Sequence, residues 1–331
     1  MSSRDSPTGP AAPTGRRGDR TWLVALAASL WGTDALLRQP LSQELAATTI
    51  VFIEHIVIVV LTAVWLPRAV RAARRASRRT QASVLLIGAG SSAVATVLFT
   101  TAFRLGDPVT PIVLQKLQPL FVVLAAWVVL GERVTTRFPV FAAPALAGAW
   151  LLAFPDPLGV SLAGAQAAAL AVAAAALWAA GTVLGRLAAA ELAADDVTVL
   201  RFAVGAPAAG LCVLALGDPL TVPARDLASL VALALGPGLL ALLLYYRGLR
   251  ATPAVRATLA ELAFPLTAAA IGVGLLGARL TVTQWCGFAC ILTAVTALAL
   301  HERMSRRPAV AAPVRADELV GRGPFQRGLG R

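Results

Sequence analysis

A group of polar residues lies inside the long apolar run from Pro111 to Thr135. Gln115, Lys116 and Gln118 stand near the start of this run, and Pro119 follows directly. A cation at the centre of a bilayer costs about 2.5–3.5 kcal/mol, so it usually faces a cavity or a partner. We therefore expect Lys116 to bind an anionic group or compensate charge, and the two amides to line a substrate cavity. The alternative is that Lys116, roughly 7 Å into the helix, extends its amine to the membrane surface.

Two acidic residues, Glu54 and Glu261, also lie in apolar runs. Glu54 is followed by His55 in an aliphatic run from Thr49 to Val60. A carboxylate next to an imidazole in a membrane handles protons or binds substrate. The alternative is a hydrogen-bonded polar pair that joins two helices. Glu261 lies 146 residues after Gln115, where a carboxylate either carries a proton or pairs with a nearby arginine.

Trp31 and Asp34 are three residues apart on one helix face, and Arg38 follows four residues later. At this spacing Asp34 either pairs with Arg38 or faces the cavity. Trp178 occupies the position of Trp31 in the second half of the chain. Both tryptophans lie several residues inside apolar runs, where they line a pocket or pack against other helices. We therefore count Trp31, Asp34 and Trp178 among the candidate substrate-binding residues.

The elements that must hold these residues are apolar blocks of membrane-spanning length. Of the 331 residues, 58% are hydrophobic and 14% are charged. The apolar residues gather in blocks of roughly 17–25, the length that a helix needs to cross a bilayer. These blocks predict an all-α polytopic membrane protein with ten transmembrane helices. The predicted spans are Trp22–Leu37, Leu45–Leu66, Ser83–Phe103, Ile112–Leu130, Phe138–Phe154, Leu162–Leu184, Val197–Leu216, Leu227–Tyr246, Val255–Leu276 and Trp285–Leu300.

Basic, polar tails at residues 1–20 and 302–331 flank the spans and are predicted to be disordered. With ten spans, most arginines fall in the tails and in the loops on the same side as the tails. The positive-inside rule then places both termini in the cytoplasm and the chain in the cytoplasmic membrane. This rule also explains the net charge of +12, so we expect no nucleic-acid partner.

The chain repeats itself at an offset of 146 or 147 residues, which pairs residues 22–154 with residues 162–300. Each repeat holds five predicted spans, and five is odd, so the second repeat is expected to cross the membrane upside down. Inverted five-helix repeats suit alternating access around a site at the bilayer midplane. The clearest matches are Trp31 with Trp178, Pro119 with Pro265, and Gly131 with Gly277.

The segment LQKLQPLFVVLAAWVVLGERVT at residues 114–135 is the most specific motif, with the Leu-Trp pairs at Trp31 and Trp178 in support. Over residues 22–300 the chain resembles the drug/metabolite transporter superfamily, EamA type. The second repeat departs from the pattern, because Gly277 is followed by Ala278 where the first repeat has Glu132. The resemblance implies a secondary transporter of small organic solutes, often an exporter, with a cavity between the halves. It implies no particular substrate.

Catalytic motifs are missing from the sequence, which carries two histidines and no zinc, nucleophile or phosphate-loop pattern. We therefore predict that the protein is not an enzyme and has no cofactor or metal. The predicted function is a secondary transporter, and its expected partners are a small-molecule substrate and the surrounding lipid bilayer. The alternative is a membrane-embedded solute sensor or a channel without coupled transport. Proton coupling and a homodimer stay open.

Overall fold

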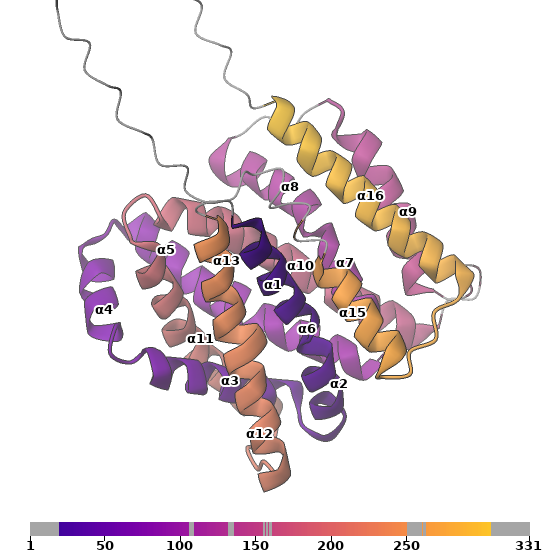
Figure 1. Cartoon of the computed structure of the whole chain (residues 1–331). Helices are drawn as coiled ribbons and strands as arrows, with labels where there is room; N and C mark the ends of the chain where they lie inside the picture. Colours follow the sequence, from indigo (N-terminus) through magenta and orange to yellow (C-terminus); the bar gives the residue numbers. More distant parts are fainter. Residues whose placement is uncertain are drawn as a thin grey trace, which may run out of the picture.

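The computed structural model describes residues 20–105, 109–131, 136–154, 156, 158, 161–249, 260 and 263–305. Within these residues the chain is helical and has no strand, which confirms the all-α prediction (Figure 1). The helices are α1 (Thr21–Gly32), α2 (Asp34–Glu44), α3 (Ala47–Thr62), α4 (Leu66–Arg75), α5 (Arg78–Leu86), η1 (Ile87–Val94), α6 (Ala95–Leu105), α7 (Val109–Leu114), η2 (Gln115–Leu117), α8 (Gln118–Leu130), α9 (Phe138–Ala153), α10 (Leu162–Ala188), α11 (Ala194–Leu216), α12 (Ala224–Leu233), η3 (Ala234–Leu240), α13 (Ala241–Leu249), α15 (Ala263–Gly274) and α16 (Val282–Ser305).

Four helical stretches of the described residues are long and apolar enough to cross a membrane, and two bent pairs raise that number to six. The chain is therefore a multi-pass membrane protein, as predicted. The bent pairs are α3 with α4, at 95°, and α7–η2 with α8, at 40°. The count of ten spans stays a prediction, because α9, α15 and α16 provide shorter apolar stretches. The four long stretches are Arg78–Leu105, Leu162–Gly185, Asp195–Leu216 and Ala224–Tyr245.

The two repeats share backbone features as well as sequence. A π-helical segment begins at Ile87 in the first repeat and at Ala234 in the second, which is the repeat offset of 147 residues. Gly131 and Gly277 both adopt left-handed backbone angles, with φ of 68° and 69°. Glycine takes this conformation without steric cost, and it ends α8 at Gly131 and turns the chain shortly after α15 at Gly277.

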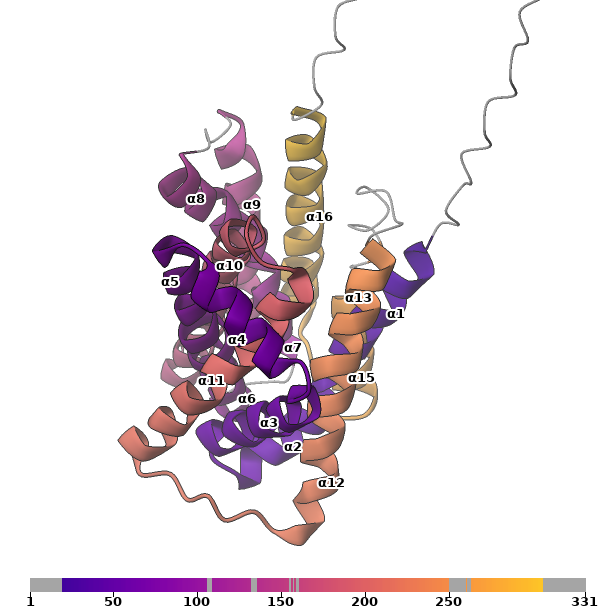
Figure 2. The ribbon, with the colours of Figure 1, turned by 90° about the vertical axis from the view of Figure 1, so that its left-hand side faces the viewer.

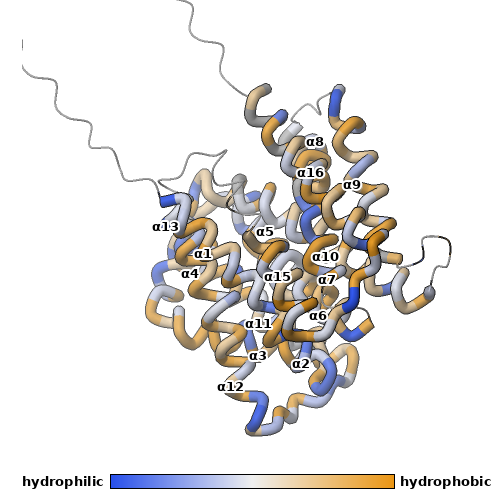
Figure 3. Tube along the Cα trace, turned by 45° about the vertical axis from the view of Figure 1, so that its right-hand side comes forward, coloured by the Kyte–Doolittle hydropathy of each residue, from blue (hydrophilic) through white to orange (hydrophobic). Residues whose placement is uncertain are grey.

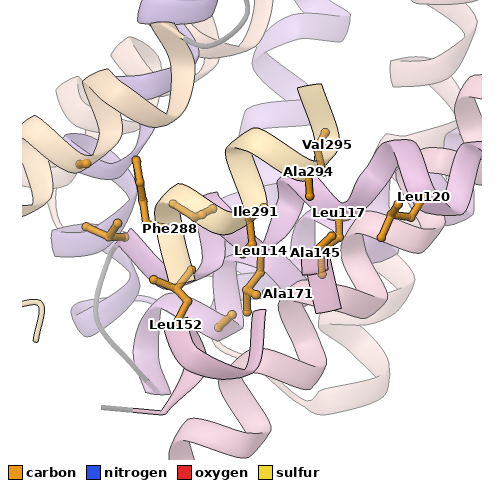
Figure 4. Packing of buried hydrophobic residues seen from close by; sticks show 14 of the residues in the cluster. Leu114, Leu117, Leu120, Ala145, Leu152, Ala171, Phe288, Ile291, Ala294 and Val295 are labelled. Carbon is orange, nitrogen blue, oxygen red and sulfur yellow. The ribbon is translucent and has the colours of Figure 1, made fainter. Parts of the chain in front are cut away.

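A hydrophobic core joins α9 and α16 to the broken helix α7–η2–α8 (Figure 4). A Cβ added at Gly148 of α9 would lie 2.8 Å from the carbonyl oxygen of Gly287 of α16, so the two backbones are in direct contact. Small residues at crossings let membrane helices approach this closely. Leu114, Leu117 and Ile291 fill the adjoining space, and the break that carries the polar residues is thereby held in place.

Helices of one repeat pack mainly on helices of the other. The first helix of the chain, α1, packs on α13 and α15, and its counterpart α10 packs on α6 and α8. The pairs α3 with α11 and α9 with α16 each join equivalent elements. These pairings are reciprocal, so exchanging the two repeats reproduces the same set of neighbours.

The two ends of the described chain lie at one end of the molecule. In Figure 2 the first turn of α1 and the last turn of α16 both point toward the upper end, while the connection from α11 to α12 closes the lower end. Hydrophobic positions follow most of the helices, and hydrophilic ones lie at the lower end around α12 and also at the upper ends near α13 and α9 (Figure 3). This distribution fits a protein whose body is surrounded by lipid.

Candidate functional site

A buried cluster forms around Arg38 of α2. Its Nε and Nη2 donate to the two carboxylate oxygens of Asp34, at 2.6 and 2.8 Å. Its Nη1 and Nη2 donate to the two oxygens of Glu54 of α3, at 3.0 and 2.9 Å. Nη1 also donates to Oγ1 of Thr100 of α6, at 2.8 Å. All five N–H bonds of the guanidinium are used, and one side chain joins three helices.

The cluster is well shielded, because the side chains of Arg38, Asp34 and Glu54 are only 5, 13 and 8% exposed. Buried charges persist only when they are paired and hydrogen-bonded, and here every guanidinium donor has an acceptor. Two carboxylates share one guanidinium, so the ionised cluster carries one formal negative charge in excess. One proton on either carboxylate makes the cluster neutral.

His55 of α3 belongs to a second polar chain. Its Nδ1 lies 2.8 Å from the carbonyl oxygen of Val51, which can only accept, so Nδ1 carries a hydrogen. Its Nε2 lies 2.9 Å from Oγ of Ser92 on η1, and that oxygen accepts from Nε of Arg201 on α11 at 3.2 Å. Gly205 of α11 leaves room for the ring, because a Cβ there would lie 2.6 Å from Cδ2. The imidazole thus joins α3, η1 and α11.

The third group gathers where α7 gives way to η2 and α8. Nζ of Lys116 lies 4.3 Å from the ring centroid of Phe264 on α15, a cation–π contact. Nε2 of Gln118 donates to Oγ1 of Thr182 on α10, at 3.3 Å. Among the residues that the structure describes, Oε1 of Gln115 is a buried oxygen that accepts no hydrogen bond. A buried acceptor of this kind is available to a donor on a bound solute.

Aromatic side chains pack in one cluster with Phe264, the ring that contacts Lys116. The rings of Trp31 and Tyr245 of α13 have centroids 5.0 Å apart, and those of Trp178 and Phe99 of α6 are 5.1 Å apart. Phe99 and Phe264 belong to one buried cluster, against which both tryptophans pack. The contacts of Lys116, Gln118, Trp31 and Trp178 therefore share one feature, which is that each joins a residue of the first repeat to a residue of the second.

The structure separates some candidates that are close in the sequence and joins others. Asp34 and Glu54, 20 residues apart, meet at Arg38, whereas Glu54 and His55 are neighbours with different partners. Glu261 lies outside the described residues.

Arg38 is the residue that sequence reasoning missed as a site candidate. It was expected only as a helix partner of Asp34, and that pairing is present. Its contact with Glu54 and Thr100 had no signal in the sequence, because neither spacing nor the repeat relates these positions. Ser92 and Arg201 were missed for the same reason, since their partners come from other helices.

Two segments of the chain, residues 21–154 and 165–300, match the model of the EamA-like transporter family. A solved structure titled "Crystal structure of protein" is similar, with a TM-score of 0.57 at 21% sequence identity. The match covers 88% of this chain and 100% of that one, which shows a shared fold. No curated protein matches this chain by sequence.

Proposed function

The chain belongs to the EamA-like transporter family, a branch of the drug/metabolite transporter superfamily, and on that basis we propose that it exports a small organic solute by alternating access. Members of this family are membrane transporters and generally not enzymes. The proposal also includes the ten-span inverted architecture, the direction of transport, the residues that bind the solute, and the coupling of transport to protons.

The inverted architecture is supported by the reciprocal packing of the repeats and by the paired π-helical segments at Ile87 and Ala234. If α1, α9, α15 and α16 also cross the membrane, each repeat has five spans, and both termini lie on one side. The exposed arginines on α4 and at the start of α5 favour the cytoplasm for that side.

The observation that carries the binding site is the set of contacts between the repeats around Lys116. A movement of one repeat against the other changes the distances from Lys116 to Phe264 and from Gln118 to Thr182 together. In the proposed mechanism, Lys116 binds an anionic group of the solute and Gln115 accepts a hydrogen bond from it. Trp31 and Trp178 enclose its apolar part.

Proton coupling is assigned to the Arg38 cluster. A proton on Glu54 or Asp34 removes the excess negative charge and weakens one arm of the guanidinium contact. Because Arg38 joins α2, α3 and α6, this loosens the packing of those helices. Loss of the proton to the other side of the membrane restores the full set of contacts. His55 has partners other than those of Glu54 and positions α3 against η1 and α11.

The test compares solutes in the medium of cells that lack the protein, overproduce it, or overproduce Lys116→Leu or Lys116→Arg. The proposal expects one solute to accumulate outside only with the unaltered protein, to drop at least tenfold with Lys116→Leu, and to be partly restored by Lys116→Arg. Equal protein in the membrane fraction is the control. Full export by Lys116→Leu would overturn the site, and solute that only equilibrates across the membrane would favour a channel.

Coupling is tested with Glu54→Gln and Asp34→Asn in vesicles loaded with that solute. Transport driven by a pH gradient should be lost in Glu54→Gln, while exchange of labelled for unlabelled solute at equal pH persists. Gradient-driven transport at the unaltered rate in both variants would remove the cluster from the coupling step and leave the transporter assignment intact.

A further inference from the structure

Six arginines form one exposed surface on α4 and the first turn of α5, which we call the arginine face. It begins where the membrane helix α3 ends. All six side chains belong to exposed residues. The members of the arginine face are Arg68, Arg71, Arg74, Arg75, Arg78 and Arg79.

The opposite side of α4 is fixed on the protein. Ala69 is fully buried, and Val70 and Ala73 pack with Val199 and Leu200 of α11 in one apolar cluster. The helix is therefore not free to roll, and its arginines stay directed away from the body of the molecule. Figure 1 places α4 at the left-hand edge of the molecule, where such a face is open to its surroundings.

The exposed surface of the chain changes from apolar to basic where α3 ends. The exposed side of α3 is apolar up to Val60 and Val64, which are 67 and 85% exposed, and then reaches Trp65. Exposed aliphatic side chains face lipid tails, and tryptophan favours the interface with the headgroups. The chain axis then turns by 95° into α4. A short helix with arginines on its exposed face, next to the lipid-facing end of α3, suits the depth of the headgroups.

The charge of the arginine face is largely uncompensated. Arg68 pairs with Asp196 of α11 at 2.9 Å. The carboxylate of Glu191, next to the start of α5, accepts hydrogen bonds from Ser77 and Thr80 and not from an arginine of this face. Arg79 donates to the carbonyl oxygen of Val129. Within the part of the chain that the structure describes, the other four members form no ion pair with a carboxylate. These four are Arg71, Arg74, Arg75 and Arg78.

We propose that the arginine face binds the phosphate headgroups of anionic phospholipids in the adjacent leaflet, such as phosphatidylglycerol. Guanidinium groups match phosphate oxygens in charge and in bidentate geometry. Basic residues next to a membrane helix attract anionic lipid through the surface potential, and the attraction is weakened by salt. The bound lipid holds the junction of α3 and α4 against the bilayer. This inference is independent of the transported solute.

The test measures the melting temperature of the purified full chain in neutral detergent, with phosphatidylglycerol or phosphatidylcholine added. We expect phosphatidylglycerol to raise the melting temperature more than phosphatidylcholine does, and we expect added salt to remove the difference. In the variant Arg71→Gln/Arg75→Gln, the difference between the effects of the two lipids on the melting temperature should fall by at least half. Each protein is compared with itself in two lipids, so a change in its basal stability does not disturb the result.

Two matched variants sharpen this test. Arg104→Gln/Arg279→Gln removes the same charge from exposed positions elsewhere and should keep the full lipid difference. Arg71→Lys/Arg75→Lys keeps the positive charge and should retain most of the lipid difference in melting temperature. Equal responses of the unaltered protein to both lipids would overturn the proposal. A lipid difference that survives in Arg71→Gln/Arg75→Gln would also overturn it.

Discussion

Glu54 in the first repeat and Arg201 in the second stand at equivalent positions, 147 residues apart. Glu54 lies in the closed cluster around Arg38, whereas Arg201 is half-buried and donates to Ser92 of the other repeat. The contrast extends to α2 and α10, where the counterparts of Asp34 and Arg38 are Gly181 and Gly185. The first repeat thus buries the acidic charge, whereas the second has glycines at the equivalent positions, of which Gly181 lies against Ser91 of the first repeat.

Other features are the same in both repeats. Glu44 contacts Arg225 at the start of α12, and its counterpart Glu191 contacts Ser77 and Thr80 at the start of α5. In each case a glutamate of one repeat ties down the first turn of a helix of the other. The backbone plan is therefore repeated, while the buried charges are specific to one half, as expected where one half has acquired a separate chemical role.

The largest expected effect comes from the charged cluster of the first repeat. Arg38→Met leaves two buried carboxylates without a cation and should destabilise the protein by about 3–5 kcal/mol. Thermal unfolding in detergent measures the loss. Arg201→Met, at the counterpart of Glu54, should cost clearly less. The triple variant Asp34→Asn/Arg38→Met/Glu54→Gln should recover much of the stability, because no buried charge is left. An Arg38→Met protein as stable as the unaltered one would contradict the comparison.

The small residues of the second repeat give the next effect. Gly205→Ala places a methyl group 2.6 Å from the His55 ring and should cost about 1–3 kcal/mol. Gly185→Ala is the matched control, since its Cβ would meet no atom within 4 Å and alanine favours a helix by roughly 0.5–1 kcal/mol. The two melting temperatures should therefore move in opposite directions, and a common shift would argue against close packing at Gly205.

A smaller, pH-dependent effect is expected for the glutamate at the start of α5. Hydrogen bonds from the Ser77 side chain, the Ser77 backbone N–H and the Thr80 hydroxyl lower the pKa of Glu191 below its usual 4.5. Because the folded-state pKa is depressed, the stabilisation is present above pH 4.5 and disappears as the pH falls through the folded value. In Glu191→Gln the melting temperature should be lower at pH 7 and should fall less steeply below pH 4.5. Parallel pH curves would exclude this contribution.

The smallest effect is expected for Glu44→Gln. The ion pair of Glu44 with Arg225 is exposed on both sides, and such pairs are screened by water and salt. The melting temperature should stay within error of the unaltered protein at moderate salt. A decrease in melting temperature as large as that of Glu191→Gln would show that the two glutamates contribute equally to stability, and are not only equivalent in position.

Much of the fold could be predicted from the sequence. Apolar blocks give the membrane class, because a helix in lipid must be about as long as the hydrocarbon is thick and must satisfy its own backbone. The repeat was also visible, through matches such as Trp31 with Trp178. The bends were not predicted, because the 95° turn after Thr62 depends on how α4 packs on α11.

By itself, the sequence determined which residues are costly to bury: Glu54, His55, Lys116 and the glutamines near it. Their cost in lipid follows from their chemistry alone, so it can be read without a fold. Only the tertiary structure decided their partners. Glu54 is bound by Arg38, His55 by Ser92, and Lys116 by a ring from the other repeat. These contacts depend on helix crossings, which are set by the shape of many small side chains together, and that is why no local pattern specified them.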